Sequence, residues 1–369
     1  MTKDFKKYKD LAIVIAFPDN WAKGEKIRDR ILYSLGITYT QYYKVGHAAL
    51  LLIKKETGEV QYFDFGRYIT PPKKGRVRSK DTDPKLAIHI KAEFDNEGEL
   101  INLFDIMSFL ESIPDATHGH GETYFSVCKN INFEYGLRYI HSLIERGNIK
   151  YITYGIGGMN CSSFVSKSLL KAIKPGRKKI NLYFSETIAP TPLGNVVNAS
   201  EKGNIWKLNT NRFDELKLNR LKVLKIIFDS TMLSLTKNKY LKKSINNFEP
   251  LNNHKRIEIP KKAQYLFSLG ESSWMHIYKN RDCNKNEFII ESYTDNNKLN
   301  YSIIAEQEEG YLNLNIPYKF TYDCNRLRTI IIQNDTKHVF YYKKDNKLIE
   351  GQINSINNSK LFFLKTKNR

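Results

Sequence analysis

Short, wholly apolar runs alternate with longer segments of helical periodicity along the first half of the chain. Three runs are too short for helices and rich in branched or aromatic side chains, which indicates buried strands. They lie at 11–17, 45–53 and 60–67, and a fourth run at 86–94 alternates apolar and polar residues like a strand with one solvated face. Helical periodicity occurs at 26–35, 103–110, 133–146 and 161–173. We therefore expect residues 1–200 to form one α+β domain with an antiparallel sheet.

The pattern changes after residue 200. Asn and Lys become frequent over 201–260 and the periodicity weakens, so this stretch is predicted to be a connector that is helical over 220–233. From 261 to 369, short β-rich runs are separated by turn sequences. The runs lie at 274–278, 287–294, 299–306, 318–322, 327–333, 338–343 and 347–353. This pattern predicts an all-β sandwich or barrel as a second domain.

The charge of the chain narrows the possible partners. Its net charge of +20 suggests nucleic-acid binding, but Lys and Arg are dispersed and no nucleic-acid motif occurs, so no such partner is expected.

No apolar run approaches the ~20 residues that a membrane span needs. The run at 11–17 is also too short for a signal peptide and lacks a small-residue cleavage site. We expect a cytoplasmic protein.

The four cysteines are too sparse for a disulfide scaffold. Cys283 and Cys324 both lie in Asp-Cys-Asn triplets. They could pair, but two reduced thiols near turns are the favoured interpretation.

Cys161 stands at the predicted start of a helix. Asn160 before it is a good N-cap residue, and apolar side chains follow at helical spacing. The N-terminus of a helix carries partial positive charge and unpaired N–H groups, which stabilise a thiolate. The N–H groups of Cys161 and Ser162 are therefore candidates for holding an oxyanion. Gly158 lets a substrate approach the backbone closely, so Gly158 and Asn160 are expected to contact substrate.

His47 begins the apolar run that we expect to be a central strand. The next run returns beside it, and if the two faces coincide, Asp64 lies near His47 and orients its imidazole. The register depends on the turn between the runs, so Tyr62 and Gln61 remain alternatives. A buried cysteine and a lone histidine are each common in ordinary cores. Their combination with a helix start and nearby glycines indicates a catalytic pair.

Two other stretches hold candidate binding residues. Arg67, Arg76 and Arg78 could bind a carboxylate or phosphate of a substrate, or could instead pair with Asp81 and Asp83 in a solvated loop.

The second stretch, Thr-His-Gly-His-Gly-Glu, contains His118 and His120 and has the residue types of a zinc site. No second ligand pair stands at convincing spacing unless Cys128 folds back, so no metal is expected. This stretch is predicted either to line the substrate cleft or to be an ordinary loop. The Tyr and Trp residues of the C-terminal runs are expected to form core and cross-strand pairs.

Three motifs carry a resemblance to a known family. Gly-His-Ala at His47, the run ending in Tyr-Phe-Asp-Phe-Gly and the sequence Asn-Cys-Ser-Ser-Phe-Val resemble the circularly permuted NlpC-type branch of the papain-like superfamily. Lecithin–retinol acyltransferase-like proteins and bacterial permuted amidases belong to that branch, in which the histidine strand precedes the cysteine helix. The interval from His47 to Asp64 is longer than usual there. More broadly, residues 11–360 resemble an uncharacterised bacterial family with a β-rich C-terminal domain.

The resemblance implies a permuted papain-like fold with Cys161 as nucleophile and His47 as base. Together with the residue pattern, it predicts a cofactor-free thiol hydrolase (a peptidase or amidase) or an acyltransferase. Peptide, isopeptide or acyl compounds are the expected substrates, and the C-terminal domain is expected to bind a protein partner. The alternative is a non-catalytic binding protein on the same scaffold.

Overall fold

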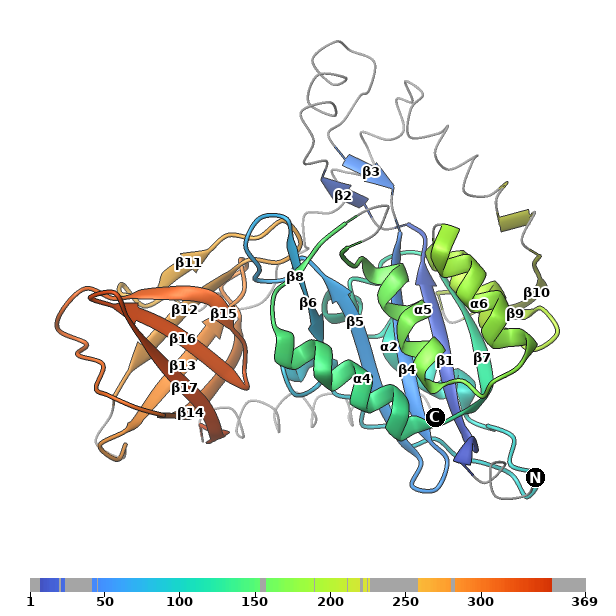
Figure 1. The fold of residues 1–369 in the computed structure, drawn as a ribbon, viewed down its shortest axis with the longest axis horizontal. Coiled ribbons are helices and arrows are strands. Elements are labelled where there is room, and N and C mark those ends of the chain that lie inside the picture. The colour runs from blue at the N-terminus through green and yellow to red at the C-terminus, as the bar shows by residue number, and fades with distance from the viewer. Residues whose placement is uncertain are drawn as a thin grey trace, which may run out of the picture. The chain divides into compact units, whose positions relative to one another are not determined.

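The chain forms two compact units, each described here by itself (Figure 1). The first comprises Met1–Gly66, Lys73–Lys80 and Leu86–Asn253, and the second Arg67–Pro72, Asp81–Lys85 and His254–Arg369. The structure is a computed structural model. It describes residues 7–19, 21–23, 42–44, 46–152, 157–188, 190–210, 212–219, 222–223, 225, 258–279 and 283–346.

An eight-stranded sheet, counted over the described residues, forms the centre of the first unit. Its strand order is β10-β9-β7-β1-β4-β5-β6-β8, and its pairings are antiparallel. The bounds are β1 (Asp10–Phe17), β4 (His47–Lys54), β5 (Glu59–Gly66), β6 (Lys74–Arg78), β7 (Thr123–Ile131), β8 (Ile149–Lys150), β9 (Asn204–Asn209) and β10 (Arg212–Lys217). The short strands β2 (Trp21–Lys23) and β3 (Tyr42–Lys44) pair separately. The strands expected at 11–17, 45–53 and 60–67 are confirmed as β1, β4 and β5.

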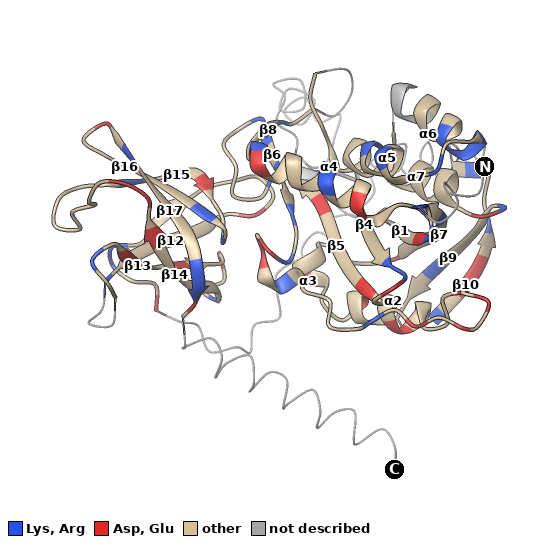
Figure 2. Ribbon diagram, turned by 60° about the horizontal axis from the view of Figure 1, so that its bottom comes forward, with Lys and Arg blue, Asp and Glu red and all other residues tan. Residues whose placement is uncertain are grey.

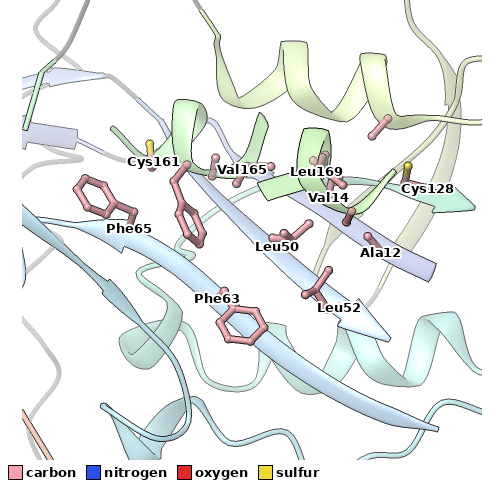
Figure 3. Packing of buried hydrophobic residues seen from close by; sticks show 14 of the residues in the cluster. Ala12, Val14, Leu50, Leu52, Phe63, Phe65, Cys128, Cys161, Val165 and Leu169 are labelled. Carbon is pink, nitrogen blue, oxygen red and sulfur yellow. The ribbon is translucent and has the colours of Figure 1, made fainter. Parts of the chain in front are cut away.

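Helices cover both faces of this sheet, which explains why β1 and β4 are apolar throughout. One face packs against α4 (Phe133–Arg146), α5 (Cys161–Ala172), α6 (Arg177–Ile188) and α7 (Pro192–Ala199). On that face Leu50, Leu52 and Phe63 meet Val165 and Leu169 of α5 (Figure 3). The other face packs against α2 (Leu103–Glu111), close to which lies the short α3 (Pro114–Thr117). The helices expected at 103–110, 133–146 and 161–173 are confirmed.

The strand expected at 86–94 is wrong. A 3-10 turn at Pro84–Leu86 precedes residues 87–93, which form no regular element in the described chain. Ala92 is buried, and Ile88 and Ile90 pack beside it against the α2 face of the sheet. One-sided packing therefore produced the alternating pattern without a strand ladder. The backbone bonds of this segment are isolated ones, such as that from the Ala92 N–H to the Gly58 carbonyl.

Residues 204–217, expected to belong to a connector, instead form the hairpin β9–β10 at one edge of the first sheet. Ile205 and Leu208 are fully buried there, although Asn and Lys surround them. The frequent polar residues concealed the strand pattern. The elements expected at 26–35 and 347–353, and most of the helix at 220–233, lie outside the described residues.

The second unit holds a sheet of seven antiparallel strands among its described residues. Their order is β11-β12-β13-β14-β17-β16-β15. The bounds are β11 (Gln264–Leu266), β12 (Ser273–Tyr278), β13 (Glu287–Tyr293), β14 (Leu299–Gln307), β15 (Lys319–Cys324), β16 (Arg328–Gln333) and β17 (Thr336–Asp345). The sheet curls around a core that includes Phe288, Phe320 and Phe340. Six of the seven strands predicted from the sequence are confirmed as β12 to β17.

The Gln264 side chain links the two edge strands, β11 and β15, into a near-barrel. Nε2 of Gln264 on β11 donates to the Tyr318 carbonyl at 2.8 Å. Its Oε1 accepts from the Phe320 N–H at 3.0 Å. The amide thus satisfies one acceptor and one donor that edge strands leave unpaired.

Charge is not concentrated on one element of either unit. Figure 2 shows Lys and Arg spread over many strands and helices, with Asp and Glu between them. Among the described residues, no helix has the length and apolarity needed to cross a bilayer.

Replacing Gln264 by Ala tests the edge closure. Each hydrogen bond contributes about 1 kcal/mol, so losing both should speed exchange of the Phe320 amide hydrogen roughly tenfold or more. Hydrogen exchange followed by NMR measures this rate. Lys319→Ala, next to Phe320 but exposed, is the control and should leave exchange unchanged. Equal protection in both variants would contradict the closure.

Candidate active site

Cys161 is the first residue of α5, and the cap before it is complete. The Asn160 side chain accepts from the Ser163 N–H at 2.8 Å, and the Ser163 hydroxyl accepts from the Asn160 N–H at 2.8 Å. This reciprocal arrangement is a capping box, which holds the helix start in one conformation. Asn160 was expected to contact substrate, but its side chain is engaged in the cap.

A buried amide supports the same turn from another helix. Asn195 of α7 is fully buried, and its Nδ2 donates to the Ser162 carbonyl at 2.7 Å. The position of Cys161 is thus determined by both the local cap and the packing of α7 on α5.

His47 is the first residue of β4 and is only 7% exposed. Gly46 before it has φ of +65°, and a Cβ there would lie 3.3 Å from the Phe17 carbonyl oxygen, so glycine suits this turn. The His47 ring stacks on Phe17 with centroids 6.1 Å apart and planes 12° apart. A Cβ on Gly119 would come within 2.5 Å of the same Phe17 ring, so this loop packs closely behind it.

The strand register places Asp64 beside His47. Ala49 pairs with Asp64, so His47, two residues earlier, projects from the same side of the sheet. The distance from His47 Nε2 to Asp64 Oδ2 is 3.2 Å. Tyr62 also donates its hydroxyl to Asp64 Oδ2 at 3.0 Å. Of the three residues considered for this position, Asp64 therefore contacts the imidazole, and Tyr62 contacts Asp64.

Arg78 extends this series of contacts, which runs from His47 to Asp64 and on to Arg78. It lies directly opposite Asp64 in the β5–β6 pairing. Its Nε donates to Asp64 Oδ1 at 2.9 Å and its Nη2 to Oδ2 at 2.5 Å. Both side chains are fully buried. Arg78 was expected to bind substrate; in this structure its Nε and Nη2 contact Asp64.

The imidazole and the thiol are also in hydrogen-bonding contact. Nε2 of His47 faces Asp64 Oδ2, so we assign the other ring nitrogen, Nδ1, to the interaction with Cys161. Burial lowers the pKa of His47, but hydrogen bonds to Asp64 and Cys161 and their negative charges raise it to about 9 overall. The arrangement therefore favours a protonated imidazole at neutral pH.

The pKa of the Cys161 thiol shifts in the opposite direction. Burial raises the pKa of Cys161, but the hydrogen bond and positive charge of His47 outweigh it and bring the pKa below its usual value. The N–H of Ala48 and the Ser162 hydroxyl act in the same direction. Cys128 lies at the opposite end of the same apolar layer (Figure 3), and there burial outweighs the positive charge of Lys178 and raises the pKa of the thiol to about 12.

Asp64 stays ionised despite its burial. Burial raises the pKa of Asp64, but the charge of Arg78 and hydrogen bonds from His47 and Arg78 hold it well below its usual range. An ionised Asp64 can accept from His47 and stabilise the imidazolium.

The structure shows local contacts for the other candidates, Arg67, Arg76 and Gly158. Arg67 belongs to the second unit, where its carbonyl accepts from the Ser268 hydroxyl at 2.8 Å. Arg76 is buried on β6, with its Nη1 3.5 Å from the Val77 carbonyl. The space beside Gly158 is filled, since a Cβ there would lie 2.6 Å from the Lys150 carbonyl oxygen.

The two histidines of the predicted loop are not brought together around a metal. His118 ends α3 in a left-handed conformation with φ of 51°. His120 Nε2 lies 3.7 Å from Asp115 Oδ1, and both side chains are well exposed. Within the described part of the chain, no three His, Cys, Asp or Glu side chains are placed to hold a metal ion.

Comparisons with known proteins add two partial family matches. Residues 12–178, which include His47, Asp64 and Cys161, match a family model described as type VI secretion system effector TseH-like. Residues 263–343 match a model described as the DUF6695 C-terminal domain. Neither match covers half of the chain.

One solved structure was also found. The crystal structure of the type VI secretion system effector TseH is 19% identical, covers 56% of this chain and 98% of its own, and has a TM-score of 0.37. No curated protein matches this chain.

Sequence reasoning missed the roles of Arg78 and Asn195. The alternation in Lys-Gly-Arg-Val-Arg indicated a face shared by Arg76 and Arg78, but only the β5–β6 register shows that Asp64 lies opposite Arg78. No sequence signal connects Asn195 with the start of α5.

The two buried cysteines provide a direct test of the electrostatics. Iodoacetamide should alkylate Cys161 at least about a hundredfold faster than Cys128 at neutral pH, because only Cys161 carries thiolate character. Below its pKa a thiol slows about tenfold per pH unit, so the labelling rate of Cys161 should begin to fall at a lower pH than that of an ordinary thiol. Peptide mapping by mass spectrometry measures both rates.

The His47→Ala variant should remove this advantage, while Cys128→Ala should leave Cys161 labelling unchanged. Similar rates for Cys161 in the presence and absence of His47 would contradict the proposed thiolate–imidazolium pair.

Proposed function

We propose that the first unit is a thiol hydrolase, acting on peptide or other amide bonds, or an acyltransferase. The observation that carries this proposal is the contact of Cys161, at a capped helix N-terminus, with a histidine whose other nitrogen faces a buried carboxylate. Cys161 is the nucleophile, His47 the general base and acid, and Asp64 the group that orients His47.

The reaction begins with the Cys161 thiolate attacking the carbonyl carbon of the substrate. The N–H groups of Cys161 and Ser162 belong to the first turn of α5, which lacks intrahelical acceptors, and they stabilise the oxyanion. Protonated His47 then gives its Nδ1 proton to the leaving amine or alcohol. Water or another acceptor attacks the resulting thioester, loses a proton to His47 and releases the acyl group.

The chain order supports a permuted papain-like arrangement. His47 and Asp64 precede Cys161, the two strands that carry them are antiparallel neighbours, and the nucleophile helix packs on their sheet. This is the order of the permuted NlpC-type branch, and no cofactor is needed for the chemistry.

The family match suggests where this chemistry is used. Because residues 12–178 match a model described as a type VI secretion system effector, we propose that the chain is an effector exported to another cell. Peptide or isopeptide amides are the proposed targets, with lipid acyl groups second. The expected cytoplasmic location then applies only before export.

A simple ester can test for the covalent intermediate. Incubation with 4-nitrophenyl acetate should produce a burst of 4-nitrophenol and an acetyl group on Cys161, detected by intact-protein and peptide mass spectrometry. Cys161→Ser should lose at least about 99% of the rate, and His47→Ala about as much. Cys128→Ala is the control. Stoichiometric binding of acetate without release of 4-nitrophenol would instead favour the non-catalytic binding protein.

Growth of a bacterial host tests the effector role. If the target lies outside the cytoplasm, expression of the chain fused to an export leader should arrest growth. If the target lies inside, expression of the chain without that leader should arrest growth. Cys161→Ala, matched for expression by immunoblot, should be harmless in both compartments. Equal toxicity of the Cys161→Ala variant would contradict an effector that acts through this thiol.

A further inference from the structure

We propose that Arg78 is a positioning residue of this site: its two-point contact keeps Asp64 ionised and in one orientation, so that Asp64 can hold His47 against Cys161. The role of Arg78 in reactivity rests on the proposed function, whereas its hold on Asp64 does not. Both oxygens of Asp64 accept from Arg78, so its effect on the thiol is transmitted through Asp64 and His47.

The geometry leaves Asp64 little freedom. Its Oδ1 accepts from Arg78 Nε, and its Oδ2 accepts from Arg78 Nη2, Tyr62 and His47. These donors come from β4, β5 and β6, so the carboxylate is held by three neighbouring strands. Rotation of Asp64 about its side-chain bonds would break at least two of these contacts.

A buried carboxylate needs a permanent counter-charge. Asp64 is fully buried, and placing an unpaired negative charge there would be costly. His47 cannot be that counter-charge throughout the reaction, because it loses and regains its proton. Arg78 stays protonated at any working pH, so Asp64 remains ionised when His47 is neutral.

The form of the guanidinium also matters. Arginine presents two parallel N–H donors that match both oxygens of a carboxylate, whereas lysine provides a point charge. Arg78 therefore determines both the charge and the plane of Asp64. A lysine at this position would preserve the charge of Asp64 but would not fix its plane, so the two effects can be separated by experiment.

The groups that face this series come from several elements. They are Cys161 from α5, His47 from β4 with Phe17 from β1 stacked on it, Tyr62 from β5, and Arg78 from β6, where Arg76 lies two residues away. With Asp64, the four charged groups alternate in sign as Arg78, Asp64, His47 and Cys161.

The first readout does not depend on catalysis. In a Cys161→Ala background, the 13C shift of the Asp64 carboxyl carbon should stay at its ionised value down to about pH 3. Arg78→Met should raise the titration midpoint by at least about one pH unit, because burial is no longer compensated. Arg78→Lys should keep Asp64 ionised. Lys80→Met, a surface cation on the next segment, is the control.

The second readout is the rate of Cys161 alkylation from about pH 5 to about pH 9. Arg78→Met should lower the rate about tenfold and move the acid limb of the profile to higher pH. Arg78→Lys should keep the position of that limb but lower the rate several-fold. In an Asp64→Asn background, Arg78→Met should add nothing further, since the two residues act as one unit.

The outcomes separate this inference from the proposed function. An unchanged Asp64 titration in Arg78→Met, or an Arg78→Lys variant identical to the parent in both readouts, would overturn the positioning role. Full additivity with Asp64→Asn would also overturn it. An ordinary thiol profile for Cys161 in the parent protein would instead refute the enzyme, while the Asp64 titration would still decide the role of Arg78. If Arg78→Met fails to fold, Arg78→Lys and the Asp64→Asn/Arg78→Met pair carry the test.

Discussion

The first unit depends on a buried row of four side chains whose charges alternate: Arg78, Asp64, His47 and Cys161. Each is at most 9% exposed, so none can rely on water to stabilise its charge. The buried row is tolerated because each charged side chain lies next to one of opposite charge and the net charge of the four is zero. Removing a single member leaves an uncompensated buried charge, and this mutual dependence links the stability of the sheet to the reactivity of the thiol.

The fold assembles this row at one end of three adjacent strands. β4 begins at His47, β5 carries Asp64 and β6 carries Arg78, so two antiparallel registers bring the three side chains together. Cys161 reaches the row from the opposite face, where α5 packs against the sheet. The two faces can meet only where a strand begins, which accounts for the position of His47 directly after the turn at Gly46.

Local sequence patterns predicted helices and strands correctly where the apolar residues of an element pack as such a pattern usually does. The helix at 133–146 carries its own cap at Asn132 and its own stop at Gly147, and the structure has it with the expected bounds. The pattern failed at 86–94, where alternation reflects packing on one side of a strandless segment, and at 204–217, where Asn and Lys concealed a hairpin. At 86–94 the missing information was the packing of the segment against the sheet, and at 204–217 it was the pairing of β9 with β7, a strand far away in the chain.

The sequence by itself determined the start of α5, since Asn160, Cys161 and Ser163 are adjacent and their cap is a short-range interaction. It also indicated His47 at the head of a buried strand. Only the tertiary structure decided that Asp64 faces His47 and that Arg78 pairs with Asp64. Strand register decides these contacts, and a shift of one residue would turn each side chain to the other face of the sheet. Such pairing is a property of the assembled sheet and of no single segment.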